Sequence, residues 1–129
     1  MAEDTPKRVL VVDDAGLVRR YYREILEGAG YQVDEALNGM EALEQVLQSR
    51  PDLLIVDINM PQMDGVTFLR TLRSRDLPIS GIPALVTSTE AGAHDASAAR
   101  KAGANYYLVK PVAQATLVDH VDLLCGVSR

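Results

Sequence analysis

The sequence predicts an α/β fold, in which a single doubly wound, five-stranded parallel sheet carries five helices on its two faces. Short apolar runs alternate five times with stretches of helical periodicity, which is typical of right-handed βαβ units. Most of these runs are apolar throughout, as strands covered on both faces are. With 129 residues, 47% of them hydrophobic, the chain is long enough to bury roughly two thirds of its unfolded surface.

Five apolar runs of strand length are the predicted strands. Four of them contain almost no polar residue between their ends, which predicts cover on both faces. The second alternates, with apolar Val33 beside polar Asp34 and Glu35, and this pattern is typical of an edge strand. The predicted strands span residues 8–12, 31–36, 53–57, 83–87 and 106–110.

The stretches between and after these runs carry apolar stripes at helical spacing. Gly28 and Gly30 are stop signals for the first helix, Asn38 is a candidate N-cap for the second, and Pro51 ends it. The fourth helix, about 93–102, is rich in alanine and has a weak stripe. The predicted inward residues are Leu17, Val18, Tyr21, Ile25 and Leu26, then Leu43, Val46 and Leu47, then Val66, Leu69 and Leu72, and finally Leu117, Val118, Val121 and Leu124.

No repeat, linker or low-complexity tract interrupts this series, so we expect residues 1–129 to form one domain without an effector domain. For five strands we expect the flavodoxin-like order 2-1-3-4-5, which is one of the common orders of doubly wound parallel sheets. Ligands of such sheets bind beyond the carboxyl ends of the strands, at the switch point between strands 1 and 3.

Composition narrows the class of protein. A net charge of −5 argues against a nucleic-acid-binding surface, which is usually basic. The single cysteine, Cys125, permits no internal disulfide and is typical of a reducing compartment. The N-terminus lacks the apolar segment of a signal peptide, and no apolar run approaches the length of about 18 residues that spans a membrane. We therefore expect a cytoplasmic, monomeric protein that contacts neither nucleic acid nor membrane.

Polar residues stand where four of the predicted strands end. Asp13 and Asp14 follow the first strand, Asp57 closes the third, Thr87 the fourth and Lys110 the fifth. One aspartate could serve as a helix N-cap, but a second needs another reason. Because neighbouring strands lie about 4.8 Å apart, the acids of the first and third strands can converge on one rim of the sheet.

Three clustered carboxylates repel one another unless a cation lies among them. Mg²⁺ prefers such oxygen ligands together with water and substrate oxygens. Asp57, at the end of an apolar run, is expected to be the least solvated of the three, and a carboxylate beside Mg²⁺ can attack phosphorus. Lys110 would then neutralise a phosphoryl oxygen, and Thr87 would donate a hydrogen bond to another.

Four motifs occur in order along this pattern, namely "VVDD", "VDINMPQMDG", "LVTS" and "YYLVKP". Each is weak alone, but together, at the spacings of a five-unit α/β fold, they are specific. From about Lys7 to Leu124 the sequence resembles a response-regulator receiver domain.

This resemblance implies that Asp57 is the phosphoacceptor and that Mg²⁺ is the cofactor. Asp14 would bind the metal directly and Asp13 mostly through water. The backbone carbonyl of Asn59 would be the third protein ligand.

The resemblance also implies that Thr87 and Lys110 hold the phosphoryl group. Tyr107 falls at the family's aromatic switch position, and the Lys110–Pro111 peptide bond is expected to be cis. Thr87 and Tyr107 would together form the switch.

By its "LVRR" and "NMPQMDG" segments and its switch tyrosine, the chain resembles stand-alone chemotaxis regulators most. Such a protein accepts phosphate from a histidine kinase or phosphotransfer protein and changes its contacts with another protein, for example a flagellar motor switch protein. It is not an enzyme beyond its own phosphoryl transfer and slow self-dephosphorylation. Ser88 and Thr89 after Thr87, and a longer 87–110 interval, depart from the chemotaxis pattern and leave the output partner open.

Two other function classes stay open at this point. A Mg²⁺-dependent phosphohydrolase with an Asp nucleophile wants a second acid two residues after that nucleophile, where this chain has Asn59. A flavin mononucleotide carrier needs a phosphate-binding loop after the first strand, where Asp13 and Asp14 would repel phosphate. Within the receiver class, the chain could also be a phosphate sink without a downstream target.

Overall fold

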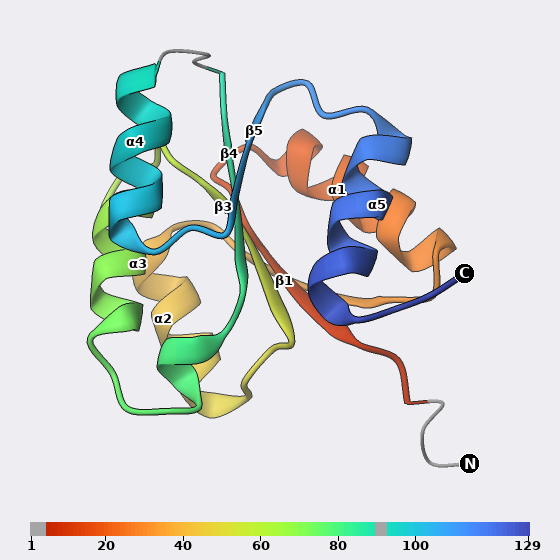
Figure 1. The fold of residues 1–129 in the computed structure, drawn as a ribbon, viewed down its shortest axis with the longest axis horizontal. Helices are drawn as coiled ribbons and strands as arrows, with labels where there is room; N and C mark the ends of the chain where they lie inside the picture. Colours follow the sequence, from red (N-terminus) through yellow and green to blue (C-terminus); the bar gives the residue numbers. More distant parts are fainter. Residues whose placement is uncertain (1–4, 90–92) are drawn as a thin grey trace.

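A computed structural model describes residues 5–89 and 93–129 of the chain. Five parallel strands form one sheet in the order β2-β1-β3-β4-β5, which confirms the predicted order (Figure 1). The strands are β1 (Arg8–Val12), β2 (Gln32–Ala36), β3 (Leu53–Asp57), β4 (Ala84–Ser88) and β5 (Tyr106–Val109).

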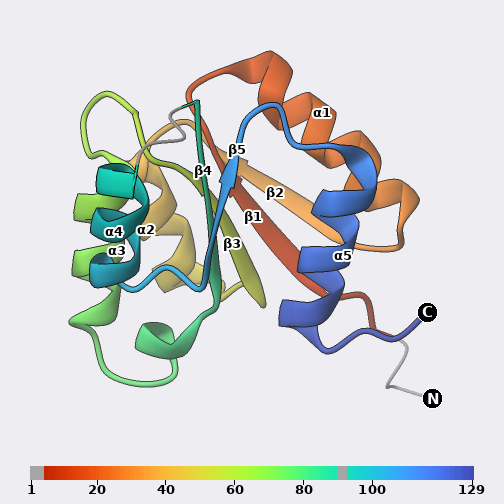
Figure 2. The same ribbon diagram turned by 45° about the horizontal axis from the view of Figure 1, so that its top comes forward.

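Helices cover both faces of the sheet. Figures 1 and 2 show α1 and α5 on one face and α2, α3 and α4 on the other. None of the helices in the described part of the chain is long and apolar enough to cross a membrane. The helices are α1 (Gly16–Gly28), α2 (Gly39–Gln48), α3 (Gly65–Arg73), α4 (Ala93–Ala102) and α5 (Gln114–Cys125), and a short 3-10 helix, η2 (Ile79–Gly81), precedes β4.

The central strands are buried on both faces because successive side chains point to opposite sides of a sheet. In β1, Val9 and Val11 join the apolar cluster under α1 and α5, whereas Leu10 and Val12 join the cluster under α2, α3 and α4. All five residues of β3 are buried. This two-sided burial explains why the sequence shows apolar runs in place of alternation.

The two edge strands differ from this pattern. In β2, Gln32 and Asp34 are exposed, Glu35 is half-buried, and Val33 and Ala36 are buried, which fits the predicted edge position although the alternation is incomplete. The expectation of cover on both faces is wrong for β5, where Tyr106 is 37% and Val109 41% exposed. The physical reason is that β5 ends the sheet, so only one neighbouring strand shields it.

The predicted inward stripe of α1 is partly wrong. Leu17 is 83% and Tyr21 43% exposed, whereas Tyr22 and Leu26 are buried. Apolar residues follow one another so closely in this helix that the stripe is wider than one face. Contact with the sheet selects its centre, and Tyr21 instead donates its hydroxyl hydrogen to the backbone carbonyl of Val112 at 2.8 Å. In α2, Leu47 is likewise 50% exposed.

Helix starts are fixed by side-chain caps at two places. The Asn38 carboxamide accepts from the backbone N–H of Glu41, as the sequence predicts, and the Glu41 carboxylate accepts from the N–H of Leu37. These two bonds satisfy backbone N–H groups at the start of α2 in a variant of the capping box, because the Glu41 carboxylate reaches Leu37 and not the N-cap residue itself. Asp64 caps α3 by accepting from the N–H of Thr67.

Gly65 lets the start of α3 approach the end of β3. A Cβ atom at this position would lie 2.6 Å from the carbonyl oxygen of Asp57 and 2.9 Å from Cα of Ile58. Both neighbours are backbone atoms of a buried segment, so they cannot move aside cheaply. The glycine of "MDG" is therefore a packing requirement next to the predicted phosphoacceptor.

We expect Gly65→Ala to lower the free energy of unfolding by about 2 kcal/mol, because the added methyl group overlaps with backbone atoms. Gly28→Ala is the matched control, since nothing lies within 4 Å of a Cβ there and alanine is the better helix former. Urea denaturation of both variants is the measurement. Equal stabilities of the two variants would contradict the close approach.

Candidate functional site

The predicted site residues meet at one rim of the sheet. Asp13 and Asp14 directly follow β1, and Asp57 is the last residue of β3. Asp57 pairs in register with Thr87 of β4. Lys110 follows β5, and its N–H donates to the carbonyl of Ser88 in β4 at 2.7 Å. The carboxyl ends of four strands thus converge, as parallel strands require.

Three carboxylates form the centre of this rim. One oxygen each of Asp13, Asp14 and Asp57 lies within 4.8 Å of the others. Asp13 is 1% and Asp57 6% exposed, whereas Asp14 is open to solvent. The expectation that Asp57 is the least solvated is therefore wrong. Asp13 is more buried because its N–H is tied to Ala36 of β2 and Lys110 covers its carboxylate.

Lys110 bridges the two buried acids. Its Nζ lies 2.7 Å from Asp13 Oδ2 and 3.3 Å from Asp57 Oδ1, and its side chain is 14% exposed. Burial alone would lower the pKa of Lys110, but its hydrogen bond with Asp13 and the charges of both acids raise it. The ammonium therefore stays charged at neutral pH and compensates part of the negative charge.

The pKa of Asp57 is raised even though Lys110 is its partner. Burial raises its pKa, and the neighbouring charge of Asp13 raises it further, while Lys110 and the backbone N–H of Asn59 oppose the rise only in part. A carboxylate in these surroundings gains from any additional positive charge.

Thr87 contributes a buried hydroxyl with spare hydrogen-bonding capacity. The residue is 0% exposed, and its Oγ1 has no hydrogen-bond partner of normal geometry in the part of the chain that the structure describes. A buried polar atom of this kind calls for an explanation. A phosphoryl oxygen at the rim would supply the missing partner.

Tyr22 of α1 belongs to the surroundings of this site, although the predicted apolar stripe of this helix did not include it. It is 1% exposed. Its pKa is raised to about 12 by burial, which the nearby Thr87 hydroxyl opposes and the charges of Asp13 and Asp57 reinforce. The sequence offers one hint, because two tyrosines follow each other at positions 21 and 22 and neighbouring residues of a helix cannot both face the sheet fully.

The acid cluster fits a divalent cation. One ammonium stands against three carboxylates at the rim, and an all-oxygen ligand set is the one that Mg²⁺ prefers. The buried, unpartnered Thr87 hydroxyl is a second indication of a missing ligand. Asn59 lies beside Asp57, to whose carboxylate its N–H donates; its carbonyl as a metal ligand stays a prediction.

Tyr107 is half-buried and packs against the cluster beneath α2, α3 and α4. Val86 belongs to the same cluster, and neighbouring side chains of a strand point to opposite faces of the sheet. The Thr87 side chain therefore lies on the face of Leu85 and Tyr22. The two predicted switch residues thus lie on opposite faces of the sheet. The Lys110–Pro111 bond is cis, as predicted.

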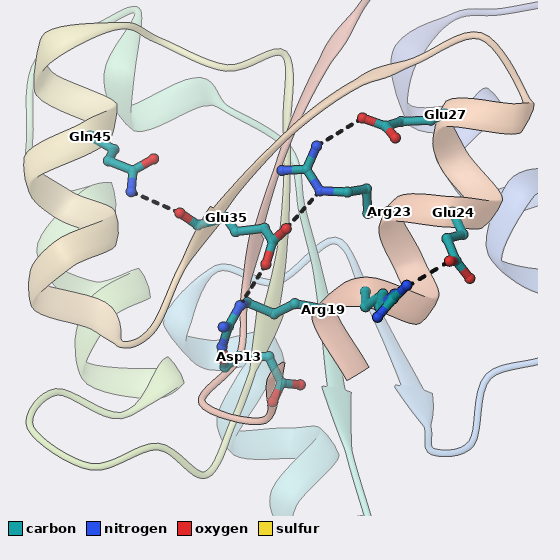
Figure 3. Close-up of polar contacts among 8 residues, drawn as sticks. Asp13, Arg19, Arg23, Glu24, Glu27, Glu35 and Gln45 are labelled. Carbon is teal, nitrogen blue, oxygen red and sulfur yellow. Dashed lines mark hydrogen bonds and ion pairs between the residues drawn. The ribbon is translucent and has the colours of Figure 1, made fainter. Parts of the chain in front are cut away.

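An ion-pair network beside the site was not predicted (Figure 3). Arg19 of α1 donates to the Asp13 carbonyl at 2.6 Å and pairs with Glu35 of β2 at 2.8 Å. Arg23 pairs with the other oxygen of Glu35 at 2.6 Å, and this hydrogen bond lowers the pKa of Glu35. Only the alternation of charges along α1 hinted at such a network, because the contacts depend on how the helix lies across the sheet.

Comparison with known proteins places these features in context. The response regulator receiver domain matches residues 9–122. The chain is 41% identical over 120 residues to the transcriptional regulatory protein PrrA of Mycobacterium tuberculosis, covering 93% of this chain and 50% of that protein. It is 43% identical over 114 residues to a protein-glutamate methylesterase/protein-glutamine glutaminase of Archaeoglobus fulgidus, covering 87% and 31%. The chain thus spans about half or less of these curated relatives.

Solved structures of response regulators are similar to this chain over almost their whole length. A putative response regulator from Chloroflexus aurantiacus has a TM-score of 0.89 at 35% identity, covering 95% of this chain and 99% of that one. The chemotaxis protein CheY4 of Vibrio cholerae has a TM-score of 0.86 at 32% identity, covering 93% and 99%.

We expect Asp57→Asn to raise the melting temperature of the metal-free protein by a few degrees at pH 7. The raised pKa of Asp57 means that its ionised form costs stability in the folded state. This cost is present above the folded pKa and disappears as the pH falls through it toward the unfolded value near 3.9. The gain of the variant should therefore shrink on acidification.

Thermal unfolding in EDTA at several pH values is the measurement. Asp76→Asn, at an exposed aspartate, is the matched control and should change the melting temperature little. A lower melting temperature of Asp57→Asn at pH 7 would show that pairing with Lys110 outweighs burial and repulsion.

Proposed function

The chain belongs to the response regulator receiver family, and on this basis we propose that it is a phosphoacceptor switch in which Asp57 takes a phosphoryl group with the help of Mg²⁺. The observation that carries this proposal is the surroundings of Asp57. Its carboxylate contacts Lys110 and lies within 4.8 Å of Asp13 and Asp14, at the end of β3 and in register with the spare hydroxyl of Thr87.

The proposed reaction is an in-line transfer to a carboxylate oxygen of Asp57. The oxygen forms a bond to phosphorus, while the bond between phosphorus and the donor atom breaks and leaves its electron pair with the donor. Asp13, Asp14, Asp57 and the Asn59 carbonyl would hold Mg²⁺, which supplies charge neutralisation for the transferred group.

Lys110 and Thr87 would then bind the phosphoryl oxygens. Lys110 holds both buried acids before the reaction, and a flexible ammonium can exchange one carboxylate partner for a phosphoryl oxygen. Thr87 can turn to donate at low cost, because its hydroxyl makes no hydrogen bond of normal geometry among the described residues and has only the contact with the Tyr22 hydroxyl to give up. Both residues thus favour the phosphorylated state by completing interactions that the free site leaves incomplete.

The phosphoryl donor is proposed to be a histidine kinase or a phosphotransfer protein of a two-component system. The output is a change in contacts with another protein or domain in the cytoplasm. Similarity to CheY4 at 32% identity supports a chemotaxis-type role, while PrrA shares 41% identity and leaves a transcriptional output as the competing one. A flagellar motor switch protein is the partner that the chemotaxis role would require.

We propose that the switch runs through the backbone of β4 and β5. Thr87 and Tyr107 lie on opposite faces of the sheet, so one side chain cannot simply fill the space that the other leaves. Thr87 pairs in register with Leu108, the neighbour of Tyr107, and Lys110 donates to the Ser88 carbonyl. Movement of Thr87 toward a phosphoryl oxygen would shift this ladder and with it Tyr107.

The alternative of a phosphohydrolase with an Asp nucleophile finds no support at this site. The position two residues after Asp57 is the exposed amide Asn59, which cannot serve as a general acid or base.

We expect the wild-type protein to acquire one phosphoryl group when incubated with acetyl phosphate and Mg²⁺, and Asp57→Asn to acquire none. Intact-mass spectrometry under acidic conditions is the measurement, since an acyl phosphate survives acid better than base. Asp76→Asn is the control and should be labelled like wild type. Labelling of Asp57→Asn to the wild-type level would overturn the assignment of the phosphoacceptor.

We expect Thr87→Ala to separate phosphorylation from signal transmission. With beryllofluoride as a phosphoryl mimic, the backbone amide resonances near Asp57 should shift in both wild type and variant. The amide of Tyr107 should shift in wild type and change by less than about half as much in Thr87→Ala, because the pull on β4 is lost. Equal shifts of Tyr107 in both proteins would mean that the signal leaves the site by another route.

A further inference from the structure

A chain of charged side chains runs from the edge strand β2 across α1 to the backbone of Asp13. Glu35 binds Arg19 through Oε1 at 2.8 Å and Arg23 through Oε2 at 2.6 Å. The Nη1 of Arg19 donates to the Asp13 carbonyl at 2.6 Å. Figure 3 shows Arg19 and Arg23 of α1 converging on Glu35, with Asp13 beyond Arg19.

The main chain of Asp13 is held on both sides. Its N–H donates to the Ala36 carbonyl at 3.1 Å, and its carbonyl accepts from Arg19. Its carboxylate also accepts from the N–H of Ala15 at 2.9 Å. Because a peptide unit is planar, the direction of the Asp13 carbonyl fixes the point from which Asp14 begins.

Asp14 depends on this support. Its side chain is exposed, and no hydrogen bond or ion pair of its carboxylate is found in the part of the chain that the structure describes. The direction of the Asp14 carboxylate toward Asp13 and Asp57 is therefore set by its backbone and by solvent. Losing the anchor on the preceding peptide would let that carboxylate turn away.

Arg19 can serve as an anchor because its guanidinium is held rigidly. The planar group uses Nε for Glu35 and Nη1 for Asp13, so the carboxylate fixes the angle at which the second nitrogen meets the carbonyl. The side chains of Arg19 and Glu35 are 15% and 29% exposed. Glu35 is fixed in turn by Arg23 and by Gln45, which donates to the Glu35 carbonyl at 2.9 Å.

We propose that Arg19, held by Glu35, is a positioning residue that aligns the Asp13–Asp14 pair for binding of a divalent cation. The inference rests on the proposed Mg²⁺ site and extends it to a second layer on α1 and β2. Groups behind metal ligands often tune affinity in this way, because they fix the orientation of the ligands without touching the metal.

Removing the charge of Arg19 changes Mg²⁺ affinity in opposite directions under the two explanations, positioning and through-space electrostatics. Arg19 is a cation close to the acid cluster, so through-space repulsion alone predicts that its removal strengthens Mg²⁺ binding. The positioning role predicts the opposite, since the acids lose their alignment. Arg20 is the matched control, because it is the neighbouring arginine, is exposed and, among the described residues, forms its ion pair with Glu24.

The experiment compares Mg²⁺ titrations of the full chain, measured by calorimetry, for wild type, Arg19→Met and Arg20→Met. We expect Arg19→Met to bind Mg²⁺ about tenfold more weakly than wild type. Arg20→Met should bind as wild type does or slightly more tightly. Thermal unfolding in EDTA fixes a titration temperature at which every variant is folded, so that loss of affinity reports on the site and not on unfolding.

A second pair of variants tests the role of Glu35. Glu35→Gln removes the group that orients Arg19, whereas Glu27→Gln removes the other carboxylate partner of Arg23 and leaves Arg19 untouched. Both changes delete one negative charge from the same network. We expect weaker Mg²⁺ binding for Glu35→Gln than for Glu27→Gln, and this pair also decides the question if Arg19→Met does not fold.

The outcomes distinguish failure of the inference from failure of the metal site. Arg19→Met that binds Mg²⁺ as tightly as Arg20→Met, or Glu35→Gln that matches Glu27→Gln, would overturn the positioning role. Asp14→Asn is included as a reference that should lose most of its Mg²⁺ affinity. If wild type bound no Mg²⁺, or Asp14→Asn bound it like wild type, the proposed metal site would be wrong and the positioning role with it.

Discussion

The charge arrangement at the carboxyl rim of the sheet is the constraint on which the rest of the site depends. Asp13 and Asp57 are almost completely buried, and burial together with the charge of Asp13 raises the pKa of Asp57. Lys110 compensates by contacting the two acids at once. These contacts allow the two buried acids to be accommodated in the folded protein. One ammonium cannot neutralise three carboxylates, so the site still favours binding of a cation.

This incomplete compensation connects stability with the proposed switching. Asp57 carries a raised pKa because its surroundings penalise the charge, and Thr87 carries a hydroxyl without a partner among the described residues. A bound cation would compensate the charge of Asp57, and a phosphoryl oxygen would accept a hydrogen bond from Thr87. The same two deficits that limit the stability of the free protein thus give ligands a free-energy difference to act on.

The support of the site comes from elements that contribute no reacting group. Asp13 does not cap α1; its carboxylate accepts from Ala15 N–H, and Ala15, the N-cap residue, makes no side-chain cap bond. The alternative of a simple capping aspartate is therefore too narrow. Arg19 and Glu35 instead tie the start of α1 to β2 and to the backbone beside the acids.

The sequence by itself determined that the chain forms a doubly wound parallel sheet, because apolar runs indicate burial on both faces. It also determined which residues lie at the rim, because parallel strands end at a common edge. It did not determine that Tyr22 faces inward while Leu17 is exposed, that Asp13 is more buried than Asp57, or that Arg19 reaches the Asp13 carbonyl. Local periodicity fixes which side chains share a face of one element. Which face is buried, and which charges meet, depends on how elements distant in sequence pack together, and only the tertiary structure decides that.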